Sequence, residues 1–382
     1  MKRPVSMSKT TRPTPPGVIA RERLFTLLDR RRRAPLIWVS GPPGCGKTTL
    51  VSSYLESKKL GALWYQLDKD DSDVATFFYY LAMASGSGTE DNVSLPLYTR
   101  EYRGDLTAYC RQFFGALYAE FKPPFVLVLD NYNEISRQSQ FDQVLLHAVS
   151  ELPADGSIIV TSRSDPPASM VRLRAGRQIE HIGWSDLQLK RRESDAIVNR
   201  WHPELSKSAL KQLFEKTEGW AAGLVLILDQ AQNEGFVERI PSLSAPQLVF
   251  DYLAGEVFDN FDSGTQQFLL DTAYLPEMTA SSAETLTRSG SAAEILARLH
   301  SDHYFVALKT GGSEPAYMYH PLLREFLQQR AAERMDEDTR RALRRRSADL
   351  LVDQGDIAQA VDVLREGGDY EAVLPLVLAH AA

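Results

Sequence analysis

The stretch that most constrains this chain is "LIWVSGPPGCGKTT", which begins at Leu36. Five β-prone residues are followed by a glycine-rich loop, and the loop opens a stretch of helical character. A loop in that setting folds its backbone N–H groups around a phosphate, and the N-terminus of the helix adds positive potential. The spacing from Gly41 to Thr48 is that of the phosphate-binding loop of nucleotide-binding proteins. We therefore expect a nucleotide-binding domain around this segment.

The polar groups of this loop have definite expected roles. Lys47 would bridge the β- and γ-phosphates, and the Thr48 hydroxyl would ligate Mg²⁺. Cys45 is expected to be a small filler side chain, because no charged neighbour in the loop sequence would activate its thiol. The loop residues that we expect to bind ATP or ADP are Gly41, Gly44, Cys45, Gly46, Lys47, Thr48 and Thr49.

Further β-rich runs alternate with helical stretches over the first half of the chain. Nearly continuous apolar strands separated by helices indicate a parallel sheet covered by helices on both faces, which is the α/β fold of a P-loop NTPase. In the helical stretch after Asp73, we expect Phe77, Leu81 and Met83 to face the core. The runs expected as strands are Leu36–Ser40, Ala62–Leu67, Phe125–Asp130, Ser157–Ser162 and Gln178–Ile182.

Two polar residues lie at the ends of expected strands. Asp130 ends "FVLVLD", where a carboxylate would hold Mg²⁺ directly or through water. Arg163 comes just past "SIIVTS", and because ligands of such sheets bind beyond the carboxyl ends of the strands, its guanidinium would reach a γ-phosphate. Asn131 follows Asp130, and an amide cannot accept a proton from an attacking water, while the direction of the nearby Glu134 carboxylate stays open. The expected catalytic residues are Lys47, Asp130 and Arg163.

The strand signal fades after Gly183, and helical segments follow. A β-hairpin is then expected from Tyr304–Lys309 and Ala316–Tyr319 around a Gly311–Gly312 turn. Pro321 suits the first position of the next helix, because its missing N–H would be unpaired there anyway. Helices, a hairpin wing and another helix together indicate a winged-helix-like module.

The two ends of the chain differ from its middle. Near the C-terminus, "QGDIAQAVDVL" and "GGDYEAVLPLV" share a pattern that is typical of helix-turn-helix repeats. Because such stacks need about three or more repeats, we expect this arm to continue in a longer protein. The basic, Pro/Thr-rich N-terminus is expected to be disordered. The expected domains are a lead-in over 1–17, a nucleotide-binding domain over 18–183, a helical domain over 184–240, a winged-helix-like domain over 241–336 and a TPR-like arm over 337–382.

Composition excludes several other classes of protein. The net charge of −7 and the pI of about 5.6 do not favour binding to nucleic acid or to an anionic membrane. No run approaches the roughly 18 apolar residues of a membrane span, and the N-terminus lacks the apolar core of a secretory signal. Only two cysteines occur, Cys45 and Cys110, so a disulfide framework is not expected and a reducing cytoplasm fits.

With these features placed, the chain resembles a known family over nearly its whole length from Val18. The segments that carry the resemblance are "VIARERL", "GPPGCGKTTL", "ALWYQLDKDDSDVATFFYYL", "VLVLDNYNEI", "VTSRSDPP", "TEGWAAGLVLIL", "FLLDTAYLPEMTA" and "YMYHPLLREFL". In this order they resemble the signal-transduction NTPases called STAND proteins, in particular the MalT-type regulators that are grouped with large LuxR-family activators.

The resemblance implies roles that spacing alone does not. Val18 and Arg21, in "VIARERL", look like the segment that receives adenine. Arg163 looks like the sensor arginine that distinguishes a terminal phosphate. The segment Glu218–Leu224 resembles the helical-domain motif that packs against the nucleotide. His320 is similar to the winged-helix histidine that touches the β-phosphate of bound ADP and locks the closed form.

The function that these features imply is a slow ATP/ADP switch in a transcriptional regulator. ADP would hold a closed form, and ATP would give an open form that self-associates, while an unknown small-molecule or protein inducer would act through the repeats. Relatives often carry a second acid where this chain has Asn131, so slow hydrolysis is expected. DNA would be bound only by a region outside this chain. The alternatives are a P-loop kinase and a motor-type ATPase with fast turnover.

Overall fold

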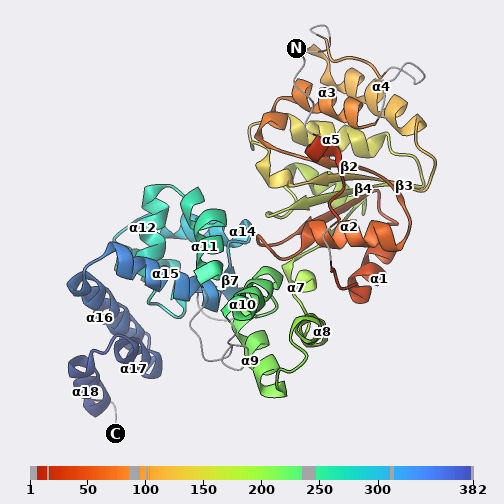
Figure 1. Ribbon diagram of the computed structural model, residues 1–382. Coiled ribbons are helices and arrows are strands. Elements are labelled where there is room, and N and C mark those ends of the chain that lie inside the picture. Colours follow the sequence, from red (N-terminus) through yellow and green to blue (C-terminus); the bar gives the residue numbers. More distant parts are fainter. Residues whose placement is uncertain are drawn as a thin grey trace, which may run out of the picture. The chain divides into compact units, whose positions relative to one another are not determined.

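The computed structural model describes residues 7–14, 17–85, 95–99, 102, 104–234, 247–309 and 314–379. The chain divides into two compact units, residues 1–188 and residues 189–382. The first unit is an α/β domain, and the second unit is helical apart from one small sheet (Figure 1).

The first unit is built on a five-stranded parallel sheet with the strand order β2-β3-β4-β1-β5. The predicted parallel sheet is therefore confirmed, with strand ends that match the expected ones or differ from them by one residue. The phosphate-loop strand β1 lies between β4 and β5, although both follow it by more than a hundred residues in sequence. The strands are β1 (Leu36–Ser40), β2 (Gly61–Gln66), β3 (Phe125–Asp130), β4 (Gly156–Ser162) and β5 (Ile179–Ile182).

Helices cover both faces of this sheet, as expected for strands that are apolar on both sides (Figure 1). Alternate residues of β1 enter different cores: Trp38 packs on one face, and Ile37 and Val39 on the other. Of the residues expected to face the core in α3, Phe77 and Leu81 are buried, but Met83 is 42% exposed because it lies two residues past Leu81 on the helix. One face carries α1 (Glu22–Arg31) and α2 (Lys47–Ser57); the other carries α3 (Val74–Ala84), α4 (Leu106–Ala119), α5 (Phe141–Ser150) and α6 (Val171–Ala175).

Part of the expected disordered lead-in packs against the first unit. Met7–Thr10 form a short 3-10 helix, η1, and the Lys9 ammonium lies 2.8 Å from Asp68 and 3.0 Å from Asp71. Asp71 is fully buried and also accepts a hydrogen bond from the Tyr65 hydroxyl at 2.7 Å. The prediction of disorder came from composition alone. Composition does not show that the buried Asp71 carboxylate needs a cation such as Lys9 as its partner.

The second unit begins with a helical bundle and continues into the expected wing. β7 and β8 are antiparallel, and Pro321 occupies the first turn of α15, as predicted. The expected Gly311–Gly312 turn lies outside the described residues. The helices are α8 (Arg191–Trp201), α9 (Lys207–Thr217), α10 (Ala221–Glu234), α11 (Gln247–Glu256), α12 (Ser263–Thr272), α13 (Ala280–Thr287), α14 (Ala292–Ser301) and α15 (Pro321–Arg334); the strands are β6 (Met278–Thr279), β7 (Val306–Lys309) and β8 (Ala316–Tyr319).

Three helices form the C-terminal arm: α16 (Glu337–Asp353), α17 (Ile357–Glu366) and α18 (Tyr370–Ala379). The repeated Gly-Asp pattern has a structural reason. Gly355 and Gly368 have positive φ angles of 83° and 71°, which favour glycine where the chain reverses. Asp356 accepts a hydrogen bond from the Gln359 N–H and so caps α17. Throughout the part of the chain that the structure describes, no helix is both long and apolar enough to cross a membrane.

Candidate nucleotide site

The phosphate loop has the strand-loop-helix setting that its sequence predicts. β1 ends at Ser40, and α2 begins at Lys47 with Gly46 as its N-cap. Gly44 and Gly46 have φ angles of 69° and 88°, a left-handed conformation that side chains disfavour. These angles turn the backbone between strand and helix, and such loops present their N–H groups to an anion.

Gly41 packs closely inside the loop. A Cβ atom at this position would lie 3.1 Å from the Cys45 sulfur and 3.2 Å from Leu187. Cys45 is 1% exposed, but the Lys47 ammonium lies 3.8 Å from its sulfur, so the expectation that no charged group neighbours this thiol is wrong. The close packing gives the first glycine of the motif a steric reason that is separate from phosphate binding.

Lys47 is already held at the loop in this structure. Its ammonium donates hydrogen bonds to the carbonyl oxygens of Gly41 at 2.7 Å and of Pro42 at 3.0 Å, and the residue is 9% exposed. A phosphate oxygen would therefore compete with two backbone carbonyls for a cation that is already placed at the loop.

Thr48 and Asp130 come together, as their predicted shared role requires. The Thr48 hydroxyl donates to the Asp130 carboxylate at 2.9 Å, and the Thr161 hydroxyl donates to the same carboxylate. Burial raises the pKa of Asp130, and these two hydroxyl groups oppose that shift. A hydroxyl and a carboxylate are hard oxygen donors, and Mg²⁺ prefers such ligands. The two side chains therefore fit a magnesium ion beside the phosphate loop.

The segment after β3 turns sharply at Asn131. This residue has φ 64° and ψ 44°, a conformation that asparagine tolerates better than most residues, and its N–H donates to Thr161 at 3.1 Å. Asn133 then donates from its side-chain amide to Glu134 and accepts the N–H of Arg163 at 3.1 Å. The Glu134 carboxylate, whose direction the sequence left open, therefore faces Asn133.

Arg163 lies directly after Ser162, which is opposite Ser40 in the pairing of β4 with β1. Its backbone is thus at the level of the phosphate loop, and its link to Asn133 joins the ends of β4 and β3. Sequence reasoning missed Asn133, because "DNYNEI" does not show which strand end its amide will face. The approach of Arg163 to a γ-phosphate stays a prediction.

Arg21 serves a purpose that the sequence did not suggest. Its guanidinium donates to the carbonyl oxygens of Leu187 at 2.8 Å and Gln188 at 3.1 Å. Leu187 ends the short helix α7 (Trp184–Leu187), so a cation satisfies carbonyl groups that have no partner within the helix. These contacts hold Arg21 at the C-terminal end of α7, and the expected contact of Val18 and Arg21 with adenine stays a prediction.

His320 belongs to the second unit. The Leu322 N–H donates to its Nδ1 atom at 3.2 Å, so His320 caps α15, and its Nε2 atom lies 3.0 Å from the Thr217 carbonyl oxygen. Nδ1 is therefore the acceptor, and Nε2 carries the proton. Burial lowers the pKa of His320 to about 4, so the ring is neutral. The contact of His320 with ADP stays a prediction.

The motif "EGWAAGL" packs the helical bundle of the second unit against the winged-helix module. Trp220 is fully buried, and its ring centroid lies 4.8 Å from that of Phe305 and 6.1 Å from that of His320. A Cβ atom at Gly223 would lie 2.3 Å from the Trp220 ring, so the second glycine of the motif makes room for the indole.

Comparison with known proteins finds family matches in both halves of the chain. Residues 254–339 match the family described as the MalT winged helix domain, and residues 18–163 match the family described as nephrocystin 3, N-terminal. The HTH-type transcriptional regulator MalT of Cronobacter sakazakii is 28% identical over 390 residues, which covers 100% of this chain. The chain spans 42% of the length of that relative.

Two solved structures align with this chain at low sequence identity. A Walker-type ATPase of Pyrococcus abyssi aligns with a TM-score of 0.56 and 12% identity, over 81% of this chain and 95% of its own. A STAND protein with a tetratricopeptide repeat sensor from Pyrococcus horikoshii aligns with a TM-score of 0.40 and 16% identity, over 99% of this chain and 52% of its own. With a phosphate loop on a parallel sheet, a match to the MalT winged helix domain and similarity to MalT along its whole length, this chain is similar to the MalT-type regulators.

Proposed function

We propose that this chain is the ATP/ADP-binding switch module of a signal-responsive transcriptional regulator. The observation that carries the proposal is the contact of Thr48 with Asp130 beside a phosphate loop that already holds Lys47. This contact supports the proposal, because in it Thr48 and Asp130 would be oxygen ligands for a metal and Lys47 would be the cation for the phosphates. The name of the MalT relative supports the regulatory context.

The residues of the first unit would divide the work of binding. The loop N–H groups and Lys47 would hold the phosphates, and Arg163 would respond to a γ-phosphate from the end of β4. Thr48 and Asp130 would hold Mg²⁺, which supplies positive charge between the β- and γ-phosphates when it is bound. Because Lys47 now donates to Gly41 and Pro42, binding would exchange those hydrogen bonds for bonds to phosphate oxygens.

The two nucleotides would favour different forms of the module. ADP would stabilise a closed form through His320, and ATP would stabilise an open form that self-associates. A nucleotide shifts such an equilibrium only through different affinities for the two forms. Contact of His320 with a phosphate would require its Nε2–H to leave the Thr217 carbonyl, so this hydrogen bond is the one that we expect to differ between the forms.

Hydrolysis would be slow because Asn131 occupies the position of a second acid. An amide cannot take a proton from water, and the Glu134 carboxylate accepts its hydrogen bond from Asn133. Replacing Asn131 with aspartate should raise ATP turnover at least about tenfold, since an orienting carboxylate would then follow Asp130. Unchanged turnover in this variant would place the cause of slow hydrolysis elsewhere.

The first test is to identify the nucleotide that co-purifies with the chain and to measure ATP and ADP affinities. Lys47→Ala should lower both affinities by about a hundredfold or more, because a cation at the phosphates is lost. Lys58→Ala is the matched control: Lys58 lies just past the end of α2 and pairs with Asp29 at 2.6 Å. Equal affinities for all three proteins would overturn the proposal.

Turnover separates the switch from its alternatives. A steady-state rate near or above about 1 s⁻¹ would favour a motor-type ATPase, and multiple-turnover phosphorylation of a metabolite would favour a kinase. We expect neither fast turnover nor phosphorylation of a metabolite. We expect instead that the purified chain carries near-stoichiometric ADP. The inducer, the self-associated form and a DNA-binding region outside this chain complete the proposal, and the printed name of the MalT relative, an HTH-type transcriptional regulator, supports the regulatory context.

A further inference from the structure

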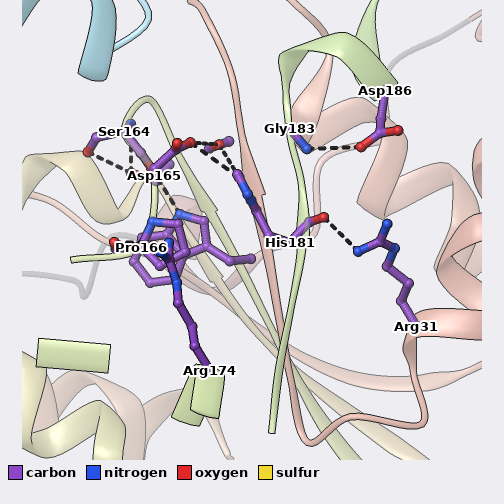
Figure 2. Close-up of polar contacts among 11 residues, drawn as sticks. Arg31, Ser164, Asp165, Pro166, Arg174, His181, Gly183 and Asp186 are labelled. Carbon is purple, nitrogen blue, oxygen red and sulfur yellow. Dashed lines mark hydrogen bonds and ion pairs between the residues drawn. The ribbon is translucent and has the colours of Figure 1, made fainter. Parts of the chain in front are cut away.

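Three polar side chains meet where the carboxyl ends of β4, β1 and β5 lie side by side. Ser40 ends β1, His181 lies on β5, and Asp165 lies in the loop after β4. The Ser40 hydroxyl is 2.6 Å from Asp165 Oδ1 and 2.7 Å from His181 Nε2, and His181 Nε2 is 3.2 Å from Asp165 Oδ1. Figure 2 shows the imidazole directed at Asp165, while the backbone carbonyl of His181 faces Arg31.

The contacts determine where the protons of this triangle lie. Ser40 is fully buried, and its hydroxyl oxygen is the only one of the three contacting atoms that can donate to the carboxylate and accept at the same time. If His181 Nε2 carried no proton, its lone pair would face a carboxylate oxygen at 3.2 Å. We therefore assign the proton to His181 Nε2. The Nε2–H group donates to the oxygen atoms of Ser40 and Asp165, and the Ser40 hydroxyl donates to Asp165.

This arrangement is not a nucleophilic triad. In such a triad the serine and the carboxylate contact different nitrogens of the histidine, so that proton removal by one is supported by the other. Here both contact the same nitrogen, and the serine is not accessible. The geometry therefore points to a structural link between three strand ends rather than to bond cleavage.

The loop joined by this link is the loop that carries Arg163. Further bonds hold its backbone: the Trp38 indole N–H donates to the Ser164 carbonyl at 2.9 Å, and Arg174 donates to the Pro166 carbonyl at 3.4 Å (Figure 2). Ser40 is also the residue immediately before Gly41, the first glycine of the phosphate loop. One hydrogen-bonded triangle therefore connects the start of the phosphate loop with the arginine loop.

We propose that Ser40, Asp165 and His181 form a positioning network that holds the Arg163 loop in register with the phosphate loop and so sets the discrimination between ATP and ADP. This inference rests on the proposed function, in which Arg163 responds to the γ-phosphate. In the proposed site, only the γ-phosphate would contact both the Arg163 loop and the phosphate loop, whereas the other phosphates would contact mainly the phosphate loop. Displacement of a contact by about 1 Å is enough to remove most of its effect.

The experiment measures ATP and ADP affinities of the full chain by calorimetric titration. His181→Leu removes the donor, and His181→Gln keeps an N–H donor of similar reach. Glu180→Gln is the matched control on the same strand, because Glu180 pairs with Arg31 at 2.7 Å and is absent from the triangle. Arg163→Ala is titrated in parallel, and circular dichroism melting checks that each variant is folded.

We expect His181→Leu to lower the ratio of ATP affinity to ADP affinity by about tenfold, which is about 1.4 kcal/mol, with ADP affinity changed by less than about threefold. His181→Gln should restore most of the ratio, and Glu180→Gln should leave it unchanged. Asp165→Asn, which has nearly the same size, tests the same link should the leucine variant unfold.

Two results would overturn the network. One is a folded His181→Leu or Asp165→Asn variant with an unchanged ratio, and the other is an equal loss of both affinities, which indicates general destabilisation. The Arg163→Ala variant distinguishes failure of the positioning network from failure of the proposed role of Arg163 at the γ-phosphate. If Arg163→Ala lowers the ratio and the network variants do not, only the positioning network fails; if Arg163→Ala leaves the ratio unchanged, its role at the γ-phosphate fails.

Discussion

The buried histidine of the second unit should make the stability of that unit depend on pH. His320 is 8% exposed, and both of its ring nitrogens have backbone partners, the Leu322 N–H and the Thr217 carbonyl. Burial lowers its pKa from 6.5 to about 4. Because the folded state resists protonation, the unfolded state binds more protons below pH 6.5, and acid favours unfolding.

The size of the effect follows from the two pKa values of His320. The stability that the neutral ring contributes is fully present above about pH 6.5 and is lost as the pH falls toward about 4. Within that window the free energy of unfolding should fall by about 1.4 kcal/mol per pH unit. Between pH 7.5 and pH 5.5 the expected loss is therefore about 1.4 kcal/mol, a factor of about ten in the opening equilibrium.

The variant His320→Asn isolates this contribution. Asparagine is a good N-cap, so the Leu322 N–H keeps an acceptor, but the new side chain does not titrate and does not reach Thr217. The Glu218 carboxylate lies 3.9 Å from His320, and desolvation raises its pKa. Because Glu218 titrates in both proteins, its own contribution cancels in the difference between them.

Hydrogen exchange of backbone amides in α15 and α10 measures the opening free energy locally, which suits a chain of several domains. Wild type and variant are compared at the same pH, so that the intrinsic exchange rate cancels. The protection factor of wild type relative to His320→Asn should fall about tenfold from pH 7.5 to pH 5.5. A constant ratio across that range would refute the inference that burial keeps the ring neutral.

Three further predictions concern other parts of the chain. Gly223→Ala should destabilise the second unit by about 1–3 kcal/mol in chemical denaturation, because the clash with Trp220 outweighs the gain of about 1 kcal/mol in helix propensity; a stabilised variant would contradict this. Lys9→Ala should cost about 3–5 kcal/mol in the same assay and more than Asp71→Ala, because it leaves the buried Asp71 carboxylate without its cation, whereas Lys9 in Asp71→Ala keeps Asp68 as a partner; the opposite ranking would contradict this. Thr48→Val should reduce the increase in nucleotide affinity that Mg²⁺ produces by about tenfold in titrations with and without the metal, and an unchanged effect of Mg²⁺ would exclude this hydroxyl as a ligand.

The local features of the fold could be predicted from the sequence, because each depends on residues close together in the chain. The phosphate loop needs only the run from Gly41 to Thr48, and the N-terminal position of Pro321 in α15 depends only on its missing N–H. The contact of Thr48 with Asp130 required one further inference, that the carboxyl ends of parallel strands share an edge of the sheet.

The remaining features depend on which strands become neighbours. The meeting of Ser40 with His181 requires β5 to lie beside β1, and the sequence alone does not give that order. The contact of Arg21 with the end of α7 likewise joins residues that are far apart in the chain, so the sequence alone does not indicate it. Lys9 lies in a segment whose composition suggests disorder, yet its partner Asp71 is buried and requires a cation.

The position of β1 in the sheet also determines the order of events during synthesis. Leu36 pairs with Ile158 on one side and with Ile179 on the other, so the strand that precedes the phosphate loop has no partner in the sheet until those residues have left the ribosome. Pairing over so long a separation is slow compared with local structure. The early half of the nascent domain thus exposes an apolar strand while its later half is still being made, and aggregation of nascent chains should be strongest in that interval.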